Sequence, residues 1–228
     1  MSHGHSLQDV SSPTPAPSPA TASLTERRKA ATRTDIARAA AGLFVRQGLK
    51  ATRAEDIAQA AGVAPRTFYR YFATKEEAVA PLYTDGAERW TRAVHDAPAA
   101  LSVPEALEHA VRHTLTPGEG ISGASWEWTR TLVRLALFDP ALHRVWAEVC
   151  HATEARLAEA LAARGVGDDA PSGLAFPAAV AAAVVRVAVE TWATGDAPAD
   201  GPEGPRARAL ANLEALKGFP WGSVGGVR

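Results

Sequence analysis

A short stretch, residues 52–75, constrains the fold of this chain more than any other part of its sequence. Thr52 is a suitable N-cap, and Glu55 follows at the spacing of a capping box, which predicts the start of a helix. Gly62 would end this helix in a left-handed conformation, and Pro65 suits the first position of a second helix. Two short helices joined by a tight turn containing Gly are typical of a helix-turn-helix.

The second helix, predicted at residues 65–72, has one apolar and one polar side. Phe68 and Phe72 are four residues apart and would face a core. The outward arc carries Arg66, Thr67, Tyr69 and Arg70. Arginine can donate two hydrogen bonds to guanine, and Tyr and Arg can reach phosphates, so this arc suits a DNA major groove. The alternative is a short amphipathic helix with ordinary solvated arginines.

The charge distribution supports a polyanionic partner for the first part of the chain only. The net charge is −1. Residues 24–75 carry eleven Lys and Arg against four Asp and Glu, whereas the remainder carries thirteen against twenty-one. A basic module joined to an acidic remainder indicates that only the module meets DNA.

Residues 61–77 resemble the signature of TetR-type bacterial transcriptional repressors. The resemblance rests on the aromatic block Phe-Tyr-Arg-Tyr-Phe at 68–72, followed by Thr-Lys-Glu-Glu at 74–77, and it extends over residues 25–95. It implies a three-helix DNA-binding domain followed by a helical ligand-binding and dimerisation domain. Ala64 departs from the pattern, because many relatives carry there a Ser that contacts a phosphate.

The resemblance also implies phosphate contacts outside the second helix. The start of the first helix, predicted at 25–47, lies along the DNA backbone in this family, although a solvated basic helix end is the alternative reading of its cations. Lys75 resembles the family's phosphate-binding lysine. The full set of candidate DNA-binding residues is Arg28, Lys29, Thr52, Arg53, Pro65, Arg66, Thr67, Tyr69, Arg70, Tyr71 and Lys75.

Helical spacing continues through the rest of the chain, without a strand pattern or an internal repeat. Further helices are predicted at 75–96, 104–115, 122–138, 140–164, 173–194 and 206–217. Pro81 should bend or loosen the first of these. The expected fold is all-α with about nine helices. The expected division is a disordered tail at 1–23, a DNA-binding domain at 24–74, a regulatory and dimerisation domain at 75–218, and a flexible tail at 219–228.

Several classes of function are disfavoured by what the sequence lacks. One cysteine, Cys150, excludes an internal disulfide, and no Cys/His set has metal-ligand spacing. A nucleophile pair of Cys150 with His143 or His151 is conceivable, but a buried thiol is far more common. No hydrolase, phosphate-loop or dinucleotide motif is present, so we expect neither an enzyme nor a cofactor. No signal peptide or run of 18 apolar residues is found, which predicts a cytoplasmic protein without a membrane partner.

Residues 178–193 are apolar on nearly all sides until Arg186 and Glu190. Such a helix is buried all round, which in a modest domain usually means a core on one side and a second subunit on the other. Together with the helix at 206–217, it predicts a four-helix homodimer interface that positions two recognition helices for a palindromic operator. The alternative is an internal helix of a monomer.

Aromatic residues outside the DNA-binding module suggest an apolar ligand cavity. The candidate ligand-binding residues are Trp90, Trp126, Arg130, Arg134, Trp146, Cys150 and Trp192. Plain core packing is the alternative for any single Trp. Residues 128–142 are also similar to a mycofactocin-regulator-like subgroup, which implies an apolar or acyl-type effector. The predicted function is therefore a homodimeric repressor released by a small ligand, with a sequence-nonspecific architectural DNA-binding protein as the alternative.

Overall fold

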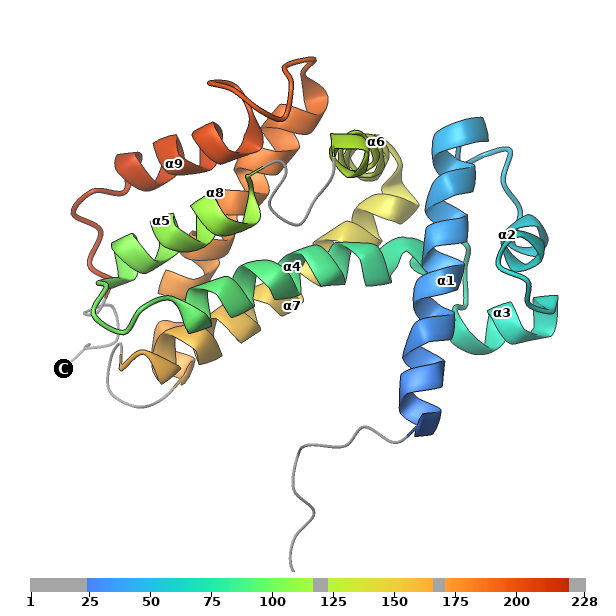
Figure 1. The fold of residues 1–228 in the computed structure, drawn as a ribbon, viewed down its shortest axis with the longest axis horizontal. Helices are drawn as coiled ribbons and strands as arrows, with labels where there is room; N and C mark the ends of the chain where they lie inside the picture. The colour runs from blue at the N-terminus through green and yellow to red at the C-terminus, as the bar shows by residue number, and fades with distance from the viewer. Residues whose placement is uncertain (1–23, 117–122, 166–170, 222–228) are drawn as a thin grey trace, which may run out of the picture.

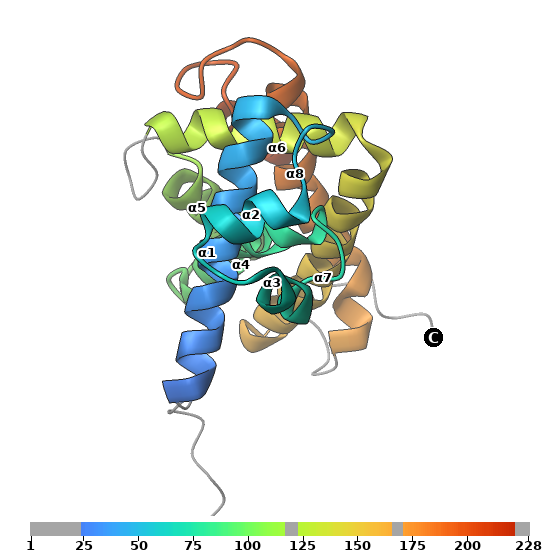
Figure 2. The same cartoon turned by 90° about the vertical axis from the view of Figure 1, so that its right-hand side faces the viewer.

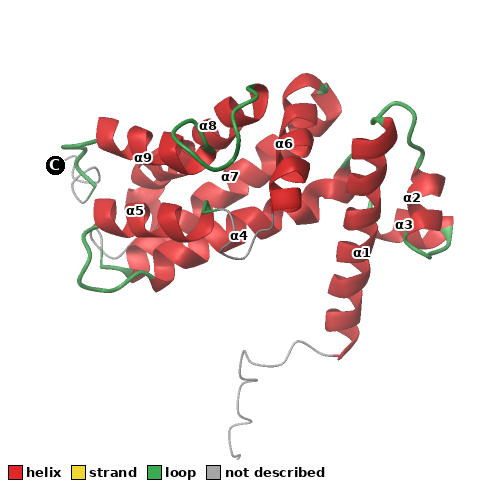
Figure 3. Cartoon of the chain, turned by 45° about the horizontal axis from the view of Figure 1, so that its top comes forward, coloured by secondary structure: helices red, strands yellow, loops and turns green. Residues whose placement is uncertain are grey.

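The computed structural model describes residues 24–116, 123–165 and 171–221, and every regular element in these ranges is a helix (Figure 3). The α-helices are α1 (Leu24–Gln47), α2 (Ala54–Ala60), α3 (Pro65–Tyr71), α4 (Ala80–Asp96), α5 (Val103–Thr114), α6 (Gly123–Phe138), α7 (Pro140–Ala163), α8 (Ala175–Thr194) and α9 (Pro205–Ala215). Two 3₁₀-helices are added, η1 (Glu77–Val79) and η2 (Pro171–Leu174). The prediction of an all-α chain with about nine helices is confirmed. The predicted tail at 1–23 lies outside the described residues.

The helices form two packed groups joined by α4 (Figure 1). α1 stands across one end of the molecule, and α2 and α3 lie on its outer side, where Figure 2 shows them in front of α1. α4 leads away from α1 and packs along α7, whereas α5, α8 and α9 form the opposite end. The connection from the α1–α3 group to the second group is therefore a continuous helix.

Two hydrophobic cores match this arrangement. The first is centred on α1–α3 and includes Ile36, Phe44 and Ile57, but it also takes Leu132 of α6 and Leu142 of α7. The second core lies among α4–α9. The first core therefore extends from the α1–α3 group into α6 and α7, so that movement of those helices reaches α1 through direct packing.

The local signals around α3 act as predicted. Gly62 has φ +68°, which an L-residue with a side chain rarely adopts. Pro65 opens α3, and Phe68 and Phe72 are both buried in the first core. The tight turn and the anchored face together fix which side of α3 remains exposed.

The start of α4 differs from the prediction. The helix does not run from residue 75; it begins at Ala80, with Pro81 in its first turn, where a missing N–H is harmless. The preceding residues form η1, because the Ala73 N–H donates to the Glu77 carboxylate (3.0 Å) and the Glu77 N–H donates to Thr74 Oγ1 (3.2 Å). Pro81 therefore starts α4 rather than bending it.

The C-terminal segment also differs from the prediction, which placed a flexible tail from residue 219. Phe219 lies 5.7 Å from the ring of Phe176 and 4.6 Å from that of Trp221, and Trp221 is buried in the second core. Burial of these rings removes apolar area from water, so Phe219 and Trp221 pack against the second group of helices.

Candidate functional site

The outer face of α3 is exposed and cationic. Arg66, Tyr69 and Arg70 are exposed, and Thr67 and Tyr71 are half-buried. Within the described part of the chain, no carboxylate lies within 4.0 Å of Arg66 or Arg70, so both guanidinium groups are available to a ligand. This face can present two cations and a hydroxyl side by side to a groove lined with phosphates.

Tyr69 is already engaged within the protein. Its hydroxyl donates to Glu55 Oε1 on α2 at 3.1 Å, and this hydrogen bond raises the pKa of Tyr69 above its usual value. The contact ties α3 to α2. A DNA phosphate would have to replace Glu55 as the acceptor, so Tyr69 has to exchange partners before it can contact DNA as the sequence predicts.

The other exposed cations lie on α1 and before α2. Arg28, Lys29 and Arg53 are all exposed, as is Pro65 at the start of α3. Arg33 is placed differently, with its guanidinium 5.0 Å from the centre of the Phe72 ring. The predicted set of phosphate contacts on α1 is thus accessible.

Two candidate DNA-binding residues, Thr52 and Lys75, are engaged inside the protein. Thr52 is 1% exposed and donates from Oγ1 to the Gly48 carbonyl (2.9 Å). Thr52 is not the N-cap of α2; Arg53 is, and its N–H donates to Asp56 Oδ2 at 2.9 Å. Lys75 Nζ donates to the carbonyls of Leu49 (2.7 Å) and Thr52 (2.8 Å). Lys75 therefore binds the loop between α1 and α2, not a phosphate, in this conformation.

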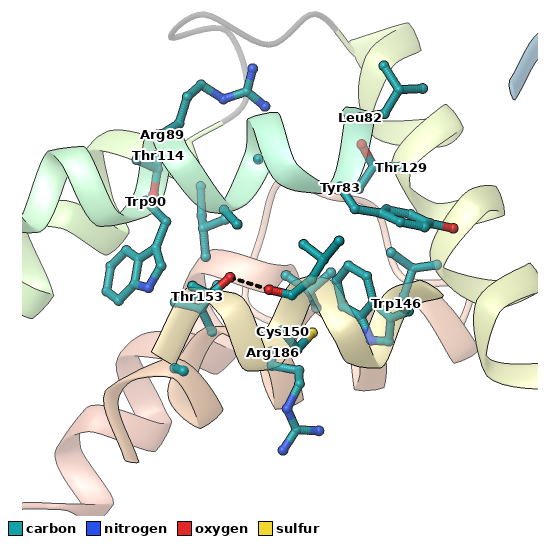
Figure 4. Close-up of a pocket in the computed structure, with 18 of the residues that line it drawn as sticks. Leu82, Tyr83, Arg89, Trp90, Thr114, Thr129, Trp146, Cys150, Thr153 and Arg186 are labelled. Atoms are coloured by element: carbon teal, nitrogen blue, oxygen red, sulfur yellow. Dashed lines mark hydrogen bonds between the residues drawn. The ribbon is translucent and has the colours of Figure 1, made fainter. Parts of the chain in front are cut away.

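A cavity of about 180 Å³ lies between α4, α6, α7 and α8, with α5 at one end (Figure 4). Each of the four helices contributes one face to it. The lining includes Tyr83, Ala87 and Trp90 of α4, Trp126, Thr129 and Val133 of α6, Trp146, Cys150 and Thr153 of α7, and Ala182, Arg186 and Val189 of α8. The wall is mainly apolar, with polar atoms at a few positions, as in small-molecule sites.

Four of the seven candidate ligand-binding residues line the cavity: Trp90, Trp126, Trp146 and Cys150. The other three, Arg130, Arg134 and Trp192, do not contribute to its lining. Arg134 donates to the carbonyls of Ala193 and Gly195, both at 2.8 Å. Arg130 lies over the ring of Trp192, 4.4 Å from its centre, and donates to the Ala197 carbonyl. Arg134 therefore satisfies carbonyl groups at the C-terminal end of α8, and Arg130 satisfies one in the loop that follows it.

Both arginines at the cavity wall are paired with carboxylates. Arg89 donates to Asp85 Oδ2 (2.8 Å) and Arg186 to Glu190 Oε2 (3.1 Å). Figure 4 shows both guanidinium groups pointing away from the enclosed space. Burial, together with the carboxylate of Glu190, raises the pKa of the Cys150 thiol to about 12, so this wall is uncharged there at neutral pH.

Tyr83 and Trp146 connect the cavity to the first core. Their rings meet edge to face at 5.1 Å, and the buried Tyr83 hydroxyl donates to the Leu132 carbonyl of α6 at 2.9 Å. Trp146 packs against both cores and donates from Nε1 to Glu190 Oε1 at 2.7 Å. A ligand that displaces either ring therefore acts on α6 and on the core beneath α1.

α1 and α6 also meet directly. Gly42 is buried in α1, and a Cβ added there would lie 3.4 Å from Cη2 of Trp128 on α6. The absence of a side chain at Gly42 lets the two helices approach closely. Trp128 and the cavity residue Thr129 are consecutive in α6, so α6 is the helix that separates the cavity from α1.

Sequence reasoning missed most of the cavity wall. The signal was a helical stripe in which large and small residues alternate, such as Tyr83, Gly86, Ala87 and Trp90 on α4. Such stripes also occur in ordinary packed cores. Only the positions of the other three helices show that the small residues leave space unfilled.

Two parts of the chain match known protein families. Residues 36–80 match the family described as bacterial regulatory proteins, tetR family, and residues 101–215 match the MftR C-terminal domain. The chain is 34% identical over 173 residues to the HTH-type transcriptional regulator TcmR of Streptomyces glaucescens, covering 74% of this chain and 76% of TcmR.

Two solved structures share the fold. FadR of Thermus thermophilus, a TetR family transcriptional repressor in complex with lauroyl-CoA, is 24% identical, with a TM-score of 0.51 over 81% of this chain and 92% of FadR. The TetR family repressor AlkX of Dietzia sp. strain DQ12-45-1b is 17% identical, with a TM-score of 0.50 over 81% of this chain and 95% of AlkX.

Proposed function

This chain belongs to the TetR family of bacterial transcriptional regulators, and we propose that it is a homodimeric repressor that binds a palindromic operator and is released by a small, largely apolar ligand. The family and the named relatives are transcriptional regulators, not enzymes. The observation that supports this proposal most strongly is that one chain combines an exposed cationic α3 with an apolar cavity and links them through α4 and α6. Binding of chromosomal DNA would place the protein in the cytoplasm.

We assign the DNA-binding function to residues 24–74 and the regulatory function to residues 75–218. Arg66 and Arg70 would read or contact the major groove, whereas Arg28, Lys29 and Arg53 would contact phosphates. The predicted effect of Arg66→Ala is a loss of about 1–3 kcal/mol on the preferred duplex and a smaller loss on random DNA. Equal losses on the two duplexes would assign Arg66 to phosphate contact and would favour a sequence-nonspecific binder.

The dimer interface is proposed on α8 and α9. Phe176, Val180, Ala183 and Val187 follow one another at helical spacing on α8, and all four are exposed or half-buried. α9 packs beside this helix, where the Asn212 side chain donates to the Val184 carbonyl at 3.0 Å. A second copy of the chain packed against this stripe of four residues would remove apolar area from water. It would also position the two α3 helices over adjacent half-sites about 34 Å apart.

In length and composition, α8 also meets the requirements for a membrane span. The core helix of a globular protein meets the same requirements, and nine residues of α8, including Trp192, are buried against the other helices. Its apolar character is therefore accounted for by the core on one side and, in our proposal, by the partner subunit on the other.

Light scattering of the full chain tests the interface. Val187→Glu places a charge on the stripe and should convert the dimer to a monomer with weakened palindrome binding. Ala155→Glu, at an exposed position of α7, is the matched control and should leave both properties unchanged. A Val187→Glu variant that remains fully dimeric would contradict this interface.

Release by ligand requires that the ligand binds one conformation of the dimer more tightly than the other. A coupling free energy of about 1–3 kcal/mol would change operator affinity about 5–150-fold. The contacts that carry this coupling are those of Tyr83 and Trp146 with the first core, together with the approach of α6 to α1 at Gly42.

A further inference from the structure

Two buried hydrogen-bond donors on the cavity wall have no acceptor among the described residues. Nε1 of Trp90 and Nε1 of Trp126 are buried, and neither atom has a partner within the described part of the chain. Both side chains line the cavity, with exposures of 4% and 2%. In Figure 4 the nitrogen edge of the Trp90 ring faces α7, which forms part of the cavity wall.

The two unsatisfied donors contrast with their neighbours. Trp192 is in edge-to-face contact with Trp126 and donates from Nε1 to the Ala197 carbonyl at 3.0 Å. Trp146 donates to Glu190 at 2.7 Å. Buried polar groups are nearly always hydrogen-bonded, and an unpaired one carries a desolvation cost. The unpaired indole N–H groups of Trp90 and Trp126 are explained if a ligand in the cavity supplies their acceptors.

The charges at the wall indicate which kind of acceptor fits. Arg89 and Arg186 are already neutralised by Asp85 and Glu190, and the lining also includes the carboxylate of Glu154. An anionic ligand would therefore enter an apolar space without an unpaired cation among the described lining residues, at a high desolvation cost. An uncharged acceptor such as a carbonyl oxygen meets no such penalty.

Size adds a further restriction. The cavity volume of about 180 Å³ is close to that of a buried apolar cavity of roughly 150 Å³ that holds benzene. It lies below the range of about 300–1,000 Å³ that is usual for larger ligands. The enclosed part of the ligand should thus be about one or two small rings in size.

Resting on the proposed function, we propose that the cavity selects an uncharged, mainly apolar ligand whose carbonyl-type oxygens accept hydrogen bonds from the indole N–H groups of Trp90 and Trp126. Apolar contact provides affinity, and the two donors provide selection for ligands that carry oxygen acceptors. A ligand of this class differs from a carboxylate, because no charged partner is required.

Three probes of similar shape test this selection on the full chain: 1-tetralone, tetralin, and tetralin-1-carboxylate. Calorimetry should show that the ketone binds about five- to tenfold more tightly than the hydrocarbon, since it satisfies a buried donor. The carboxylate should bind most weakly. In protein labelled with ¹⁵N at the indole nitrogens, at least one of the Trp90 and Trp126 Nε1–H signals should move downfield with the ketone, and neither should move downfield with tetralin.

Substitutions separate hydrogen bonding from shape. Trp90→Phe and Trp126→Phe keep a ring and remove the N–H, so the substitution at the donor whose signal moves with the ketone should lower the preference for ketone over hydrocarbon. Trp192→Phe removes an N–H that is already bonded and should leave this preference unchanged. If a substituted chain does not fold, the indole signals of the unsubstituted protein still decide.

Equal binding of ketone and tetralin, tighter binding of the carboxylate, or no binding of any probe would overturn the inference. None of these measurements includes DNA. Selection of a palindromic duplex would still support the proposed repressor if the ketone fails, and a ketone preference would survive if no duplex is selected.

Discussion

Lys75 is a residue for which the family resemblance and the structure predict different roles. Its ammonium group donates to the Leu49 and Thr52 carbonyls at 2.7 and 2.8 Å, and the nearest carboxylate oxygen, on Glu76, is 4.0 Å away. Two hydrogen bonds from a charged donor contribute about 1.5–3 kcal/mol each, and ordering a lysine side chain costs about 2 kcal/mol. Lys75→Met should therefore destabilise the protein by about 2 kcal/mol, which lowers Tm by about 4–8 °C.

The assay combines thermal unfolding with the salt dependence of DNA binding. Lys50→Met, at an exposed lysine of the same loop, is the matched control and should change Tm by little. At a temperature where all variants are folded, Lys75→Met should keep the slope of log Kd against log salt. Lys29→Met should reduce that slope by about one, as expected for a lost phosphate contact. A stable Lys75→Met variant with a reduced slope would refute the structural role of Lys75.

Two further predictions concern the second group of helices. Arg164 at the end of α7 donates to the carbonyls of Ala97, Pro98 and Leu101 at 2.7–3.0 Å. Arg164→Met should therefore lower Tm by about 5–10 °C, whereas Arg144→Met, at an exposed position, should leave Tm unchanged. Equal melting curves of the two variants by circular dichroism would contradict the role of Arg164. The pKa of Cys150 is raised from 9.0 to about 12, so at pH 8 iodoacetamide should alkylate the native thiol roughly a thousandfold more slowly than the thiol in urea. Because the pKa of Cys150 is higher in the folded than in the unfolded state, its contribution to stability is present below pH 9 and is lost as pH rises toward 12. Cys150→Ala should remove this pH dependence. Equal alkylation rates in the native protein and in urea would refute the burial of the thiol.

The sequence was most informative where structure depends on neighbouring residues. Gly62, Pro65, Phe68 and Phe72 determine the turn, the start of α3 and its buried side within a few residues, and all four are placed as predicted. Helix existence was likewise predictable from spacing. The boundary at Pro81 was not, because a 3₁₀ turn stabilised by Thr74 and Glu77 replaces the expected first helical turn.

Contacts between a side chain and a distant part of the chain could not be predicted from the sequence. Lys75 binds carbonyl groups 23 and 26 residues away, and Arg134 binds carbonyl groups 59 and 61 residues away. None of these carbonyl partners can be inferred from local periodicity. The unpaired indoles of Trp90 and Trp126 are of the same kind, since only the packing of α4 against α6, α7 and α8 shows that they lack acceptors.

The most direct test of the central claim is selection of bound duplexes from a random pool by the purified full chain at near-physiological salt. The account predicts enrichment of one palindrome, whose half-sites are centred about one helical turn, ~34 Å, apart and are bound by one dimer. No enrichment, with salt-sensitive binding of equal strength to every duplex, would contradict a sequence-specific repressor and would favour an architectural DNA-binding protein.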